Sequence, residues 1–438
     1  MSIFDIFKPS PYIQEIKDEK IVRKKYRYWR IRIFYSMYLG YALFYLSRKS
    51  YNFAMPFIIH DLGFTKTQVG IVGSMLTMTY GFSKFITGIM SDKSNPRYFM
   101  AIGLIFTGVF NILFGFSSSL IFFIIFAGFN GWFQGFGWPP CAKLLTHWYS
   151  HSERGAWWSV WNTSHNVGGA TIPVLTAFIA THFGWRYSMY LPGIICILGG
   201  IFLINRLRDT PRSLGLPSVE KYKKETLPSN KEKETLKLKD LLYNFVLNNK
   251  YIWFLAITSF FIYVIRTSIN DWSMLFLIEQ KGYSKLVASL GPCLFEVGGF
   301  LGSLTAGWSS DILTKGKRGP INFVFTLFLI LTLLIFWQLP AIYVIIDYIL
   351  LTLIGFFVFG PQMLMGIVAA ESSHKKAAGT ATGFIGVFGY VGATAAGGPL
   401  GKIIEKWGWG EGFFTVLVLS GIIALIFFIF LLPAKAKV

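Results

Sequence analysis

Long apolar segments separated by short polar connections make up most of the chain. Twelve of these segments are 19 to 30 residues long, and a helix needs about 20 apolar residues to cross the hydrocarbon core of a membrane. The pattern therefore predicts an all-α membrane protein with twelve transmembrane helices. They are expected at about residues 31–56, 67–91, 98–116, 119–146, 156–181, 187–205, 251–279, 286–311, 320–338, 341–370, 378–401 and 411–432.

The longest polar stretch, residues 206–250, is charged, contains three prolines and leaves six apolar segments on either side. Such a composition is typical of a linker between two domains. The predicted organisation is an N-terminal segment (1–30), a six-helix bundle (31–205), a cytoplasmic linker (206–250), a second six-helix bundle (251–432) and a tail (433–438).

The two halves of the chain repeat one another. Gly88-x-x-x-Asp92 closes the second apolar segment, and Gly307-x-x-x-Asp311 closes the eighth, 219 residues later. Arg48 and Arg266 each lie inside the first apolar segment of a half and are 218 residues apart. Matches in nearly one register indicate a parallel duplication, with two six-helix bundles related by an axis along the membrane normal.

The composition and the charge distribution agree with a membrane protein. The chain is 53% hydrophobic and only 14% charged, whereas soluble domains are about 25% charged. Of the 41 lysines and arginines, 29 fall on the side of the predicted helices that holds both termini, and 6 fall on the opposite side. By the positive-inside rule, both termini are expected to be cytoplasmic, and we expect the protein to lie in the cell inner membrane. The net charge of +20 therefore does not indicate nucleic-acid binding.

The sequence indicates neither a cleaved leader nor an enzyme. The first thirty residues are polar and basic, without the apolar core of a signal peptide. Cys141, Cys196 and Cys293 have no paired spacing and are interpreted as packing residues. No paired carboxylates, nucleophile motif or phosphate-binding loop is present, so we predict no enzymatic activity, no cofactor and no metal site.

Arg48 and Arg266 are the strongest candidates for function. A charge at membrane depth costs at least roughly 2.5–3.5 kcal/mol and usually marks a functional site, and a guanidinium binds phosphate or carboxylate through a rigid fork of donors. The two arginines are therefore expected to face a central cavity and bind an anion. The alternative is a structural ion pair with Asp271, Glu296 or Asp347.

Several tyrosines accompany these arginines. Tyr41, Tyr45 and Arg48 follow at spacings of four and three residues and so share one helix face, and Tyr263 lies one turn before Arg266. Their hydroxyls suit a hydroxylated, phosphorylated ligand, although tyrosine is also common in bundle packing and at membrane interfaces.

Two further basic side chains lie inside predicted spans. Lys84, one turn after Tyr80, either adds positive charge to the anion site or extends toward the cytoplasmic end of its helix. His165, between Asn162 and Asn166, either binds phosphate or a proton, or is a hydrogen-bonded packing residue.

The two loops that begin with an aspartate and continue with basic residues are interpreted as gates. Asp92 lies near Arg97, and Asp311 lies near Arg318, so each aspartate is able to pair across a helix junction in one conformation and release in another. Positive-inside topology alone explains the bases but not the aspartates.

The segments that contain these residues, among them GYALFYLSRKSYNFAMP, GFSKFITGIMSDKSNPR, GWFQGFGWPPCAKLLTHWYS, YVIRTSINDW and AAGTATGFIGVFGYVG, resemble the organophosphate:phosphate antiporter family of the major facilitator superfamily. This family includes hexose-phosphate and glycerol-3-phosphate transporters, a hexose-phosphate sensor and a glucose-6-phosphate translocase. The resemblance covers nearly the whole chain and implies the major facilitator fold.

The resemblance also implies a set of substrate-binding residues. The phosphate-binding arginines, lysine and histidine of the family correspond to Arg48, Arg266, Lys84 and His165. The cavity tyrosines correspond to Tyr41, Tyr45, Tyr80, Tyr263 and Tyr390. Phe359 stands where glycerol-phosphate relatives have a tyrosine, and with Gln362 nearby it favours the hexose-phosphate group.

The function that the resemblance implies is exchange of a sugar phosphate, glucose-6-phosphate or another hexose phosphate, for inorganic phosphate by alternating access. One alternative is a membrane sensor of external glucose-6-phosphate that signals to a histidine kinase. Another is a glycerol-3-phosphate:phosphate antiporter. A proton-driven sugar or drug carrier fits poorly because it gives no reason for two cavity arginines.

Overall fold

The computed structural model describes residues 8–225, 246–340, 343–372 and 378–432, and every regular element in these residues is a helix. Each of the twelve predicted helices corresponds to one helix or to a consecutive pair. The helices of the first half are α1 (Glu19–Leu62), α2 (Lys66–Asp92), α3 (Pro96–Phe116), α4 (Leu120–Gln134), α5 (Trp138–Trp148), α6 (His151–Asn162), α7 (Ser164–Phe183) and α8 (Tyr187–Arg206).

The connection between the halves, residues 207–249, is described at 207–225 and 246–249, and its first part contains η2 (Pro211–Leu214) and α9 (Val219–Lys223). Most of the predicted linker's second part, residues 226–245, lies outside the described residues. The helices of the second half are α11 (Lys250–Glu279), α12 (Lys285–Ile312), α13 (Arg318–Gln338), α14 (Val344–Glu371), α15 (Ala378–Ala395), α16 (Gly398–Trp407), η6 (Gly408–Phe414) and α17 (Thr415–Leu431).

The predicted helix over 119–146 is divided into α4 and α5 in the structure. The break falls at residues 135–137, directly before Pro139 and Pro140. Because proline has no backbone N–H and clashes with the preceding turn, the two prolines begin a new helix rather than continue α4.

Eight segments of the described chain are long and apolar enough to cross a membrane. Two of them combine neighbouring helices, Leu120–Trp148 and Thr380–Leu431. The long helices α1 and α2, which carry Arg48 and Lys84, come in addition to these eight. The all-α fold predicted from the hydrophobic pattern is confirmed.

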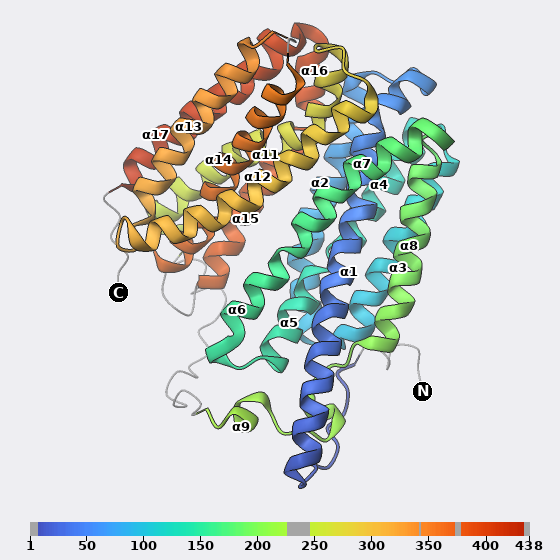
Figure 1. Cartoon of the computed structure of the whole chain (residues 1–438), viewed down its shortest axis with the longest axis vertical. Coiled ribbons are helices and arrows are strands. Elements are labelled where there is room, and N and C mark those ends of the chain that lie inside the picture. The colour runs from blue at the N-terminus through green and yellow to red at the C-terminus, as the bar shows by residue number, and fades with distance from the viewer. Residues whose placement is uncertain (1–7, 226–245, 341–342, 373–377, 433–438) are drawn as a thin grey trace. The chain divides into compact units, whose positions relative to one another are not determined.

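The described chain forms two compact units (Figure 1). Unit 1 contains residues 1–50, 79–169 and 186–234, and unit 2 contains residues 51–78, 170–185 and 235–438. The last turns of α1, the first turns of α2 and the end of α7 thus belong with the helices of the second half.

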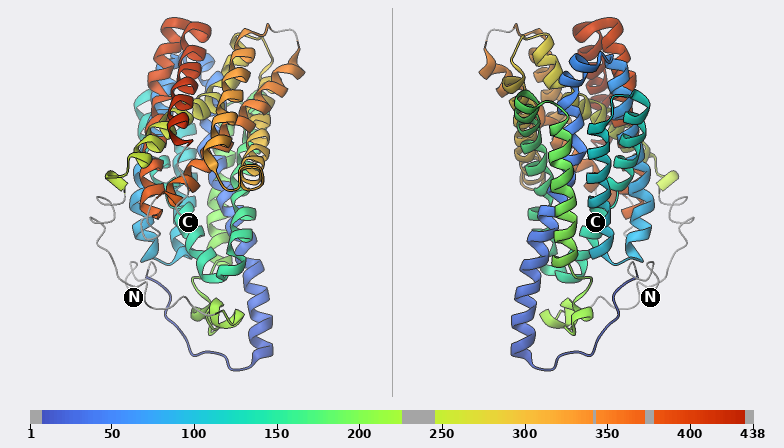
Figure 2. Two further views of the ribbon diagram at one scale, coloured as in Figure 1. Left: turned by 90° about the vertical axis from the view of Figure 1, so that its left-hand side faces the viewer. Right: turned by 90° about the vertical axis from the view of Figure 1, so that its right-hand side faces the viewer.

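In unit 1, α3 and α8 lie side by side (Figure 1) and approach closely at glycines. A Cβ on Gly108 would lie 2.5 Å from the Gly193 carbonyl oxygen. The first turns of α1 extend past the other helices of this unit, with α9 beside them (Figure 2). There Tyr26 stacks on Tyr222, with ring centroids 4.0 Å apart.

In unit 2, polar contacts join the N-terminal end of α2 to helices of the second half of the chain. Lys66 forms an ion pair with Glu279, at 3.0 Å. The Thr67 hydroxyl donates to a Glu405 carboxylate oxygen at 2.5 Å, and the Thr67 backbone N–H donates to the same oxygen at 3.1 Å. The Ser74 hydroxyl donates to the Thr394 carbonyl at 2.6 Å.

The closest helix pair of unit 2 is α12 with α14, and it depends on glycines. A Cβ on Gly302 would lie 1.9 Å from the Phe356 carbonyl oxygen, and a Cβ on Gly298 would lie 1.9 Å from the Thr352 carbonyl oxygen. Any larger side chain at either position therefore meets backbone, which cannot rotate away.

We expect Gly302→Ala to destabilise the protein, because the added methyl group separates α12 from α14 and overpacking costs about 1–3 kcal/mol. The matched control is Gly383→Ala on α15, where a Cβ meets no atom within 4 Å. Thermal unfolding in detergent should show a lower midpoint for the first variant and an unchanged or higher midpoint for the second. Equal midpoints would contradict the close packing of α12 and α14.

Candidate functional site

Arg48 is buried in unit 1, with 8% of its surface exposed. Its guanidinium carbon lies 4.4 Å from the Tyr45 ring centroid and 4.2 Å from the Tyr80 ring centroid, so it contacts two aromatic rings. Its Nε donates to Gln134 Oε1 at 3.0 Å. These contacts fix the plane of the guanidinium, since cation–π contacts and a hydrogen bond to Nε each restrict its orientation.

Gln134, at the end of α4, holds Arg48 in place and was not among the candidates from the sequence. Its Nε2 donates to the Phe44 carbonyl, the Ser47 hydroxyl and Asn130 Oδ1, each at 3.1 Å. The signal in the sequence is a single glutamine inside the aromatic run GWFQGFGW, because an amide at that depth needs polar partners.

The other candidates of unit 1 surround Arg48 through aromatic contacts. Tyr41 and Tyr45 meet edge to face, with ring centroids 5.9 Å apart, and Tyr45 lies 5.8 Å from the ring of His165. His165 Nδ1 is hydrogen-bonded to the Asn162 carbonyl. The structure thus places Tyr41, Tyr45, Tyr80 and His165 in one group with Arg48.

Lys84 is connected with this group only through a series of tryptophan rings. Its Nζ lies 5.2 Å from the ring centroid of Trp138. Trp138 contacts Trp158, which contacts Trp161, and Trp161 lies 4.9 Å from the Tyr41 ring. Lys84 therefore lies on the edge of an aromatic group that connects it with Tyr41.

Arg266 in unit 2 has a different environment. It is half-buried, and its guanidinium carbon lies 4.5 Å from the Phe359 ring centroid and 5.8 Å from that of Tyr263. Tyr263 meets Tyr390 edge to face at 6.0 Å, and its hydroxyl accepts a hydrogen bond from Gln362 Nε2 at 3.3 Å. The four substrate-binding residues predicted for this half, Arg266, Tyr263, Tyr390 and Gln362, therefore lie in one group together with Phe359.

Asp347, considered above as an ion-pair partner for the arginines, has other partners. It is fully buried and pairs with Lys281 at 3.2 Å, and its second oxygen accepts from the Tyr283 hydroxyl at 2.5 Å. Glu296, also buried, accepts a hydrogen bond from Asn270 Nδ2 at 2.9 Å. Asp347 thus stabilises the end of α14 and does not neutralise Arg48 or Arg266.

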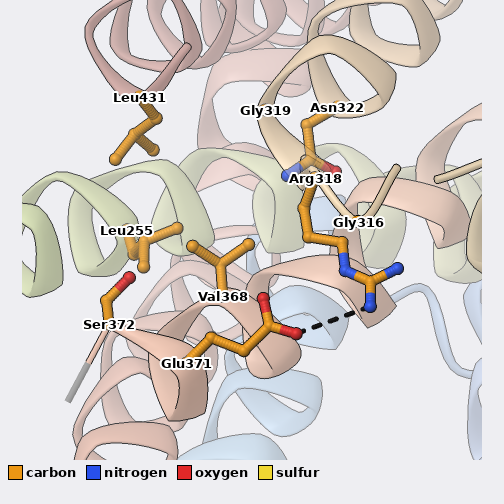
Figure 3. A pocket seen from close by; sticks show the side chains of 9 residues that line it. All are labelled: Leu255, Gly316, Arg318, Gly319, Asn322, Val368, Glu371, Ser372 and Leu431. Carbon is orange, nitrogen blue, oxygen red and sulfur yellow. Dashed lines mark hydrogen bonds and ion pairs between the residues drawn. The ribbon is translucent and has the colours of Figure 1, made fainter. Parts of the chain in front are cut away.

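The predicted gate of unit 2 is an ion-pair cluster. Arg318 Nη1 lies 2.5 Å from an Asp311 oxygen, and Arg318 Nη2 lies 3.4 Å from Glu371 Oε1. Figure 3 shows the Arg318–Glu371 pair, marked by a dashed line, at a small pocket that Leu255, Val368 and Leu431 also line. The sequence did not identify Glu371 as a partner, because it follows Arg318 by 53 residues.

The corresponding residues of unit 1 are arranged differently. The Asp92 side chain lies outside the described residues. Arg97 Nε donates to the Ile204 carbonyl, and its guanidinium lies 4.9 Å from the ring centroid of Tyr98. Arg97 is thus held against the end of α8.

These features define a class of protein: an all-helical chain whose two halves each carry an arginine set against aromatic rings in the middle of a long helix is typical of a secondary transporter. A family model described as Major Facilitator Superfamily matches residues 37–397. The chain belongs to the Major Facilitator Superfamily and is a multi-pass membrane protein.

Three relatives are similar over almost their whole length. The probable hexose phosphate transport protein of Chlamydia trachomatis serovar D is 58% identical, covering 97% of this chain and 95% of that protein. Membrane sensor protein UhpC of Escherichia coli is 47% identical, covering 94% and 95%. The glycerol-3-phosphate transporter of Bacillus subtilis is 40% identical, covering 97% of both. The predicted membership of the organophosphate group is confirmed.

A solved structure supports the fold independently. An inward-facing bacterial homologue of the human lysosomal transporter Spinster matches with a TM-score of 0.75, covering 92% of this chain and 96% of that one. At 15% sequence identity, this similarity concerns the fold alone.

We expect Gln134→Met to lower the affinity for inorganic phosphate, used as the simplest tetrahedral anion, by about tenfold or more. The substitution removes the acceptor of Arg48 Nε, and a hydrogen bond to a charged group is worth about 1.5–3 kcal/mol. Equilibrium binding of radiolabelled phosphate to the purified protein measures the change. Gln280→Met, at an exposed position after α11, is the matched control; equal affinities in the two variants would contradict the role of Gln134.

Proposed function

We propose that the protein exchanges a sugar phosphate, most specifically a hexose phosphate such as glucose-6-phosphate, for inorganic phosphate across the cell inner membrane. The observation that carries this proposal is the pair of intramembrane arginines, Arg48 and Arg266, each set against aromatic rings. The relatives named for hexose phosphate and glycerol-3-phosphate transport support a phosphorylated substrate.

In this proposal, the two arginines bind the phosphoryl group that both ligands share. Guanidinium groups stay charged at every physiological pH and bind phosphate through two parallel N–H donors. Lys84 and His165 add positive charge or donors, and the tyrosines supply hydroxyl groups. Without an anion the cations repel one another, so the loaded carrier changes conformation more readily than the empty one, which couples the two fluxes.

Alternating access requires polar contacts at the helix ends to open and close. Lys66–Glu279 and Thr67–Glu405 join the two halves of the sequence at one end of the helices. We propose that these contacts, together with the predicted gates at Asp92, Arg97, Asp311 and Arg318, exchange partners during transport. With both termini cytoplasmic, the latter four lie at the cytoplasmic end.

We propose that Gln362 recognises the sugar by accepting a hydrogen bond from one of its hydroxyl groups. Its Oε1 is buried and has no hydrogen-bond partner among the described residues, whereas its Nε2 is bound to Tyr263. A buried acceptor without a donor is costly, and a sugar hydroxyl is a suitable donor.

Proteoliposomes loaded with phosphate test the exchange directly. We expect Arg48→Lys to reduce phosphate-driven uptake of glucose-6-phosphate by at least about tenfold, because an ammonium cannot bind Gln134 and a phosphate through the same planar fork. Arg266→Lys should behave similarly. The control is Arg27→Lys, an exposed position on α1.

Full exchange by Arg48→Lys would refute the phosphoryl clamp. An absence of exchange in the parent protein, with retained binding of glucose-6-phosphate, would favour the second candidate function. That candidate is a sensor of external glucose-6-phosphate that signals to a histidine kinase, and the similarity to UhpC favours it.

We expect Phe359→Tyr to shift the preference toward glycerol-3-phosphate by roughly threefold to tenfold relative to glucose-6-phosphate. The new hydroxyl would lie near Arg266 and supply a polar group that a smaller substrate lacks, and one such hydrogen bond is worth about 0.5–1.5 kcal/mol net. Competition of both compounds against radiolabelled phosphate measures the ratio. Phe430→Tyr, at an exposed position of α17, is the control; the same ratio in both variants would contradict the role of Phe359.

A further inference from the structure

Four arginines gather where α3 begins and α8 ends in unit 1. Arg97 Nε donates to the Ile204 carbonyl. Arg32 Nη2 donates to the Asn205 carbonyl at 3.1 Å and to its side-chain oxygen at 2.9 Å. Arg208 Nη1 donates to the Asn205 carbonyl at 3.0 Å. Together with Arg206, the last residue of α8, they form what we call the arginine cluster.

Aromatic rings hold the arginine cluster in place. The guanidinium carbons of Arg32 and Arg208 lie 5.0 Å and 4.9 Å from the ring centroid of Trp29. Arg206 lies 5.5 Å from the Phe202 ring centroid. A guanidinium that contacts a ring through its face keeps the N–H groups at its edge available for a further acceptor.

The arginine cluster contains no compensating carboxylate. Among the described residues, none of its four members forms an ion pair, and Arg206 makes no hydrogen bond. The acceptors are carbonyl oxygens at the end of α8, and a helix end supplies only about half a negative charge. Burial, and then the neighbouring charges of Arg97 and Arg32, hold the pKa of Arg208 below its usual range. The positive charge is therefore dense and not neutralised by these residues.

The arginine cluster lies at the end of an apolar surface. Leu191, Ile194, Leu198 and Ile201 are exposed and follow at spacings of three or four residues, so they form one stripe along α8. The same stripe continues to Asn205, which is exposed and binds Arg32. The candidate membrane spans Pro96–Phe116 and Tyr187–Arg206 begin and end here. The cluster thus lies at the ends of two candidate membrane spans.

We propose that Arg32, Arg97, Arg206 and Arg208 bind the phosphate headgroup of an anionic phospholipid in the leaflet at this end of the helices. A lipid phosphate brings the missing negative charge, and its acyl chains lie along the exposed stripe of α8. The apolar stripe favours a lipid over a free anion, because only a lipid has acyl chains that cover the exposed apolar side chains. This site shares Arg97 with the proposed cytoplasmic gate, but it is separate from the proposed substrate site and does not depend on it.

The test is the affinity of the purified full-length protein for phosphatidylglycerol and for phosphatidylcholine with the same acyl chains, measured by native mass spectrometry. A basic residue near an anionic headgroup contributes about fivefold to binding. We expect Arg32→Gln combined with Arg208→Gln to weaken phosphatidylglycerol binding on the order of 20-fold, and Arg206→Gln about fivefold. Phosphatidylcholine binding should change by no more than about twofold, because its choline group offsets the charge of its phosphate. Arg206→Gln removes no hydrogen bond, so it tests the proposal even where the double variant folds poorly.

The matched control is Arg23→Gln combined with Arg27→Gln, which removes the same charge from two exposed positions of α1. We expect phosphatidylglycerol binding within about twofold of the parent there. Equal weakening in the control and double variants would show a general charge effect and overturn the proposal. So would parent-like binding in Arg206→Gln, or complete displacement of the lipid by millimolar inorganic phosphate, which would assign the cluster to the free ion.

Discussion

The burial of a permanent positive charge at Arg48 is the constraint on which the first half of the molecule depends. An arginine at this depth is tolerated only where protein groups replace water, and here Gln134, Tyr45 and Tyr80 do so. The close approach of α2 and α4 serves this arrangement, since a Cβ on Gly135 would lie 2.2 Å from the Ser83 hydroxyl. The same short segment at the end of α4 therefore provides both the hydrogen bond to Arg48, through Gln134, and the close contact with α2, through Gly135.

The second half repeats the arginine but not its surroundings. Arg48 is buried and bound to an amide, whereas Arg266 is half-buried between Phe359 and Tyr263. In our proposal, this difference separates two roles. The half with Arg48 holds the phosphoryl group in a fixed orientation, and the half with Arg266 and Gln362 recognises the sugar attached to the phosphoryl group. A duplicated fold is well suited to this division because each half can vary its lining while both keep one cation.

Much of the fold followed from the sequence because a transmembrane helix requires a long apolar run, and such runs are visible locally. The group around Arg48 was predictable in part, since Tyr41, Tyr45 and Arg48 share a helix face by spacing alone. Gln134 was missed because it lies 86 residues from Arg48, and no local pattern reports such a contact. The pairing of Asp347 with Lys281 was missed for the same reason, because both residues lie at the ends of helices that meet only in the folded chain.

The central claim is that inorganic phosphate and a hexose phosphate occupy one site containing Arg48 and Arg266. Equilibrium binding of radiolabelled phosphate to the purified protein, displaced by increasing glucose-6-phosphate, tests it most directly. We predict complete displacement, with the apparent affinity for glucose-6-phosphate falling in proportion to the phosphate present, as for a single shared site. Simultaneous binding of both compounds, or displacement that leaves a constant fraction of phosphate bound, would contradict the account.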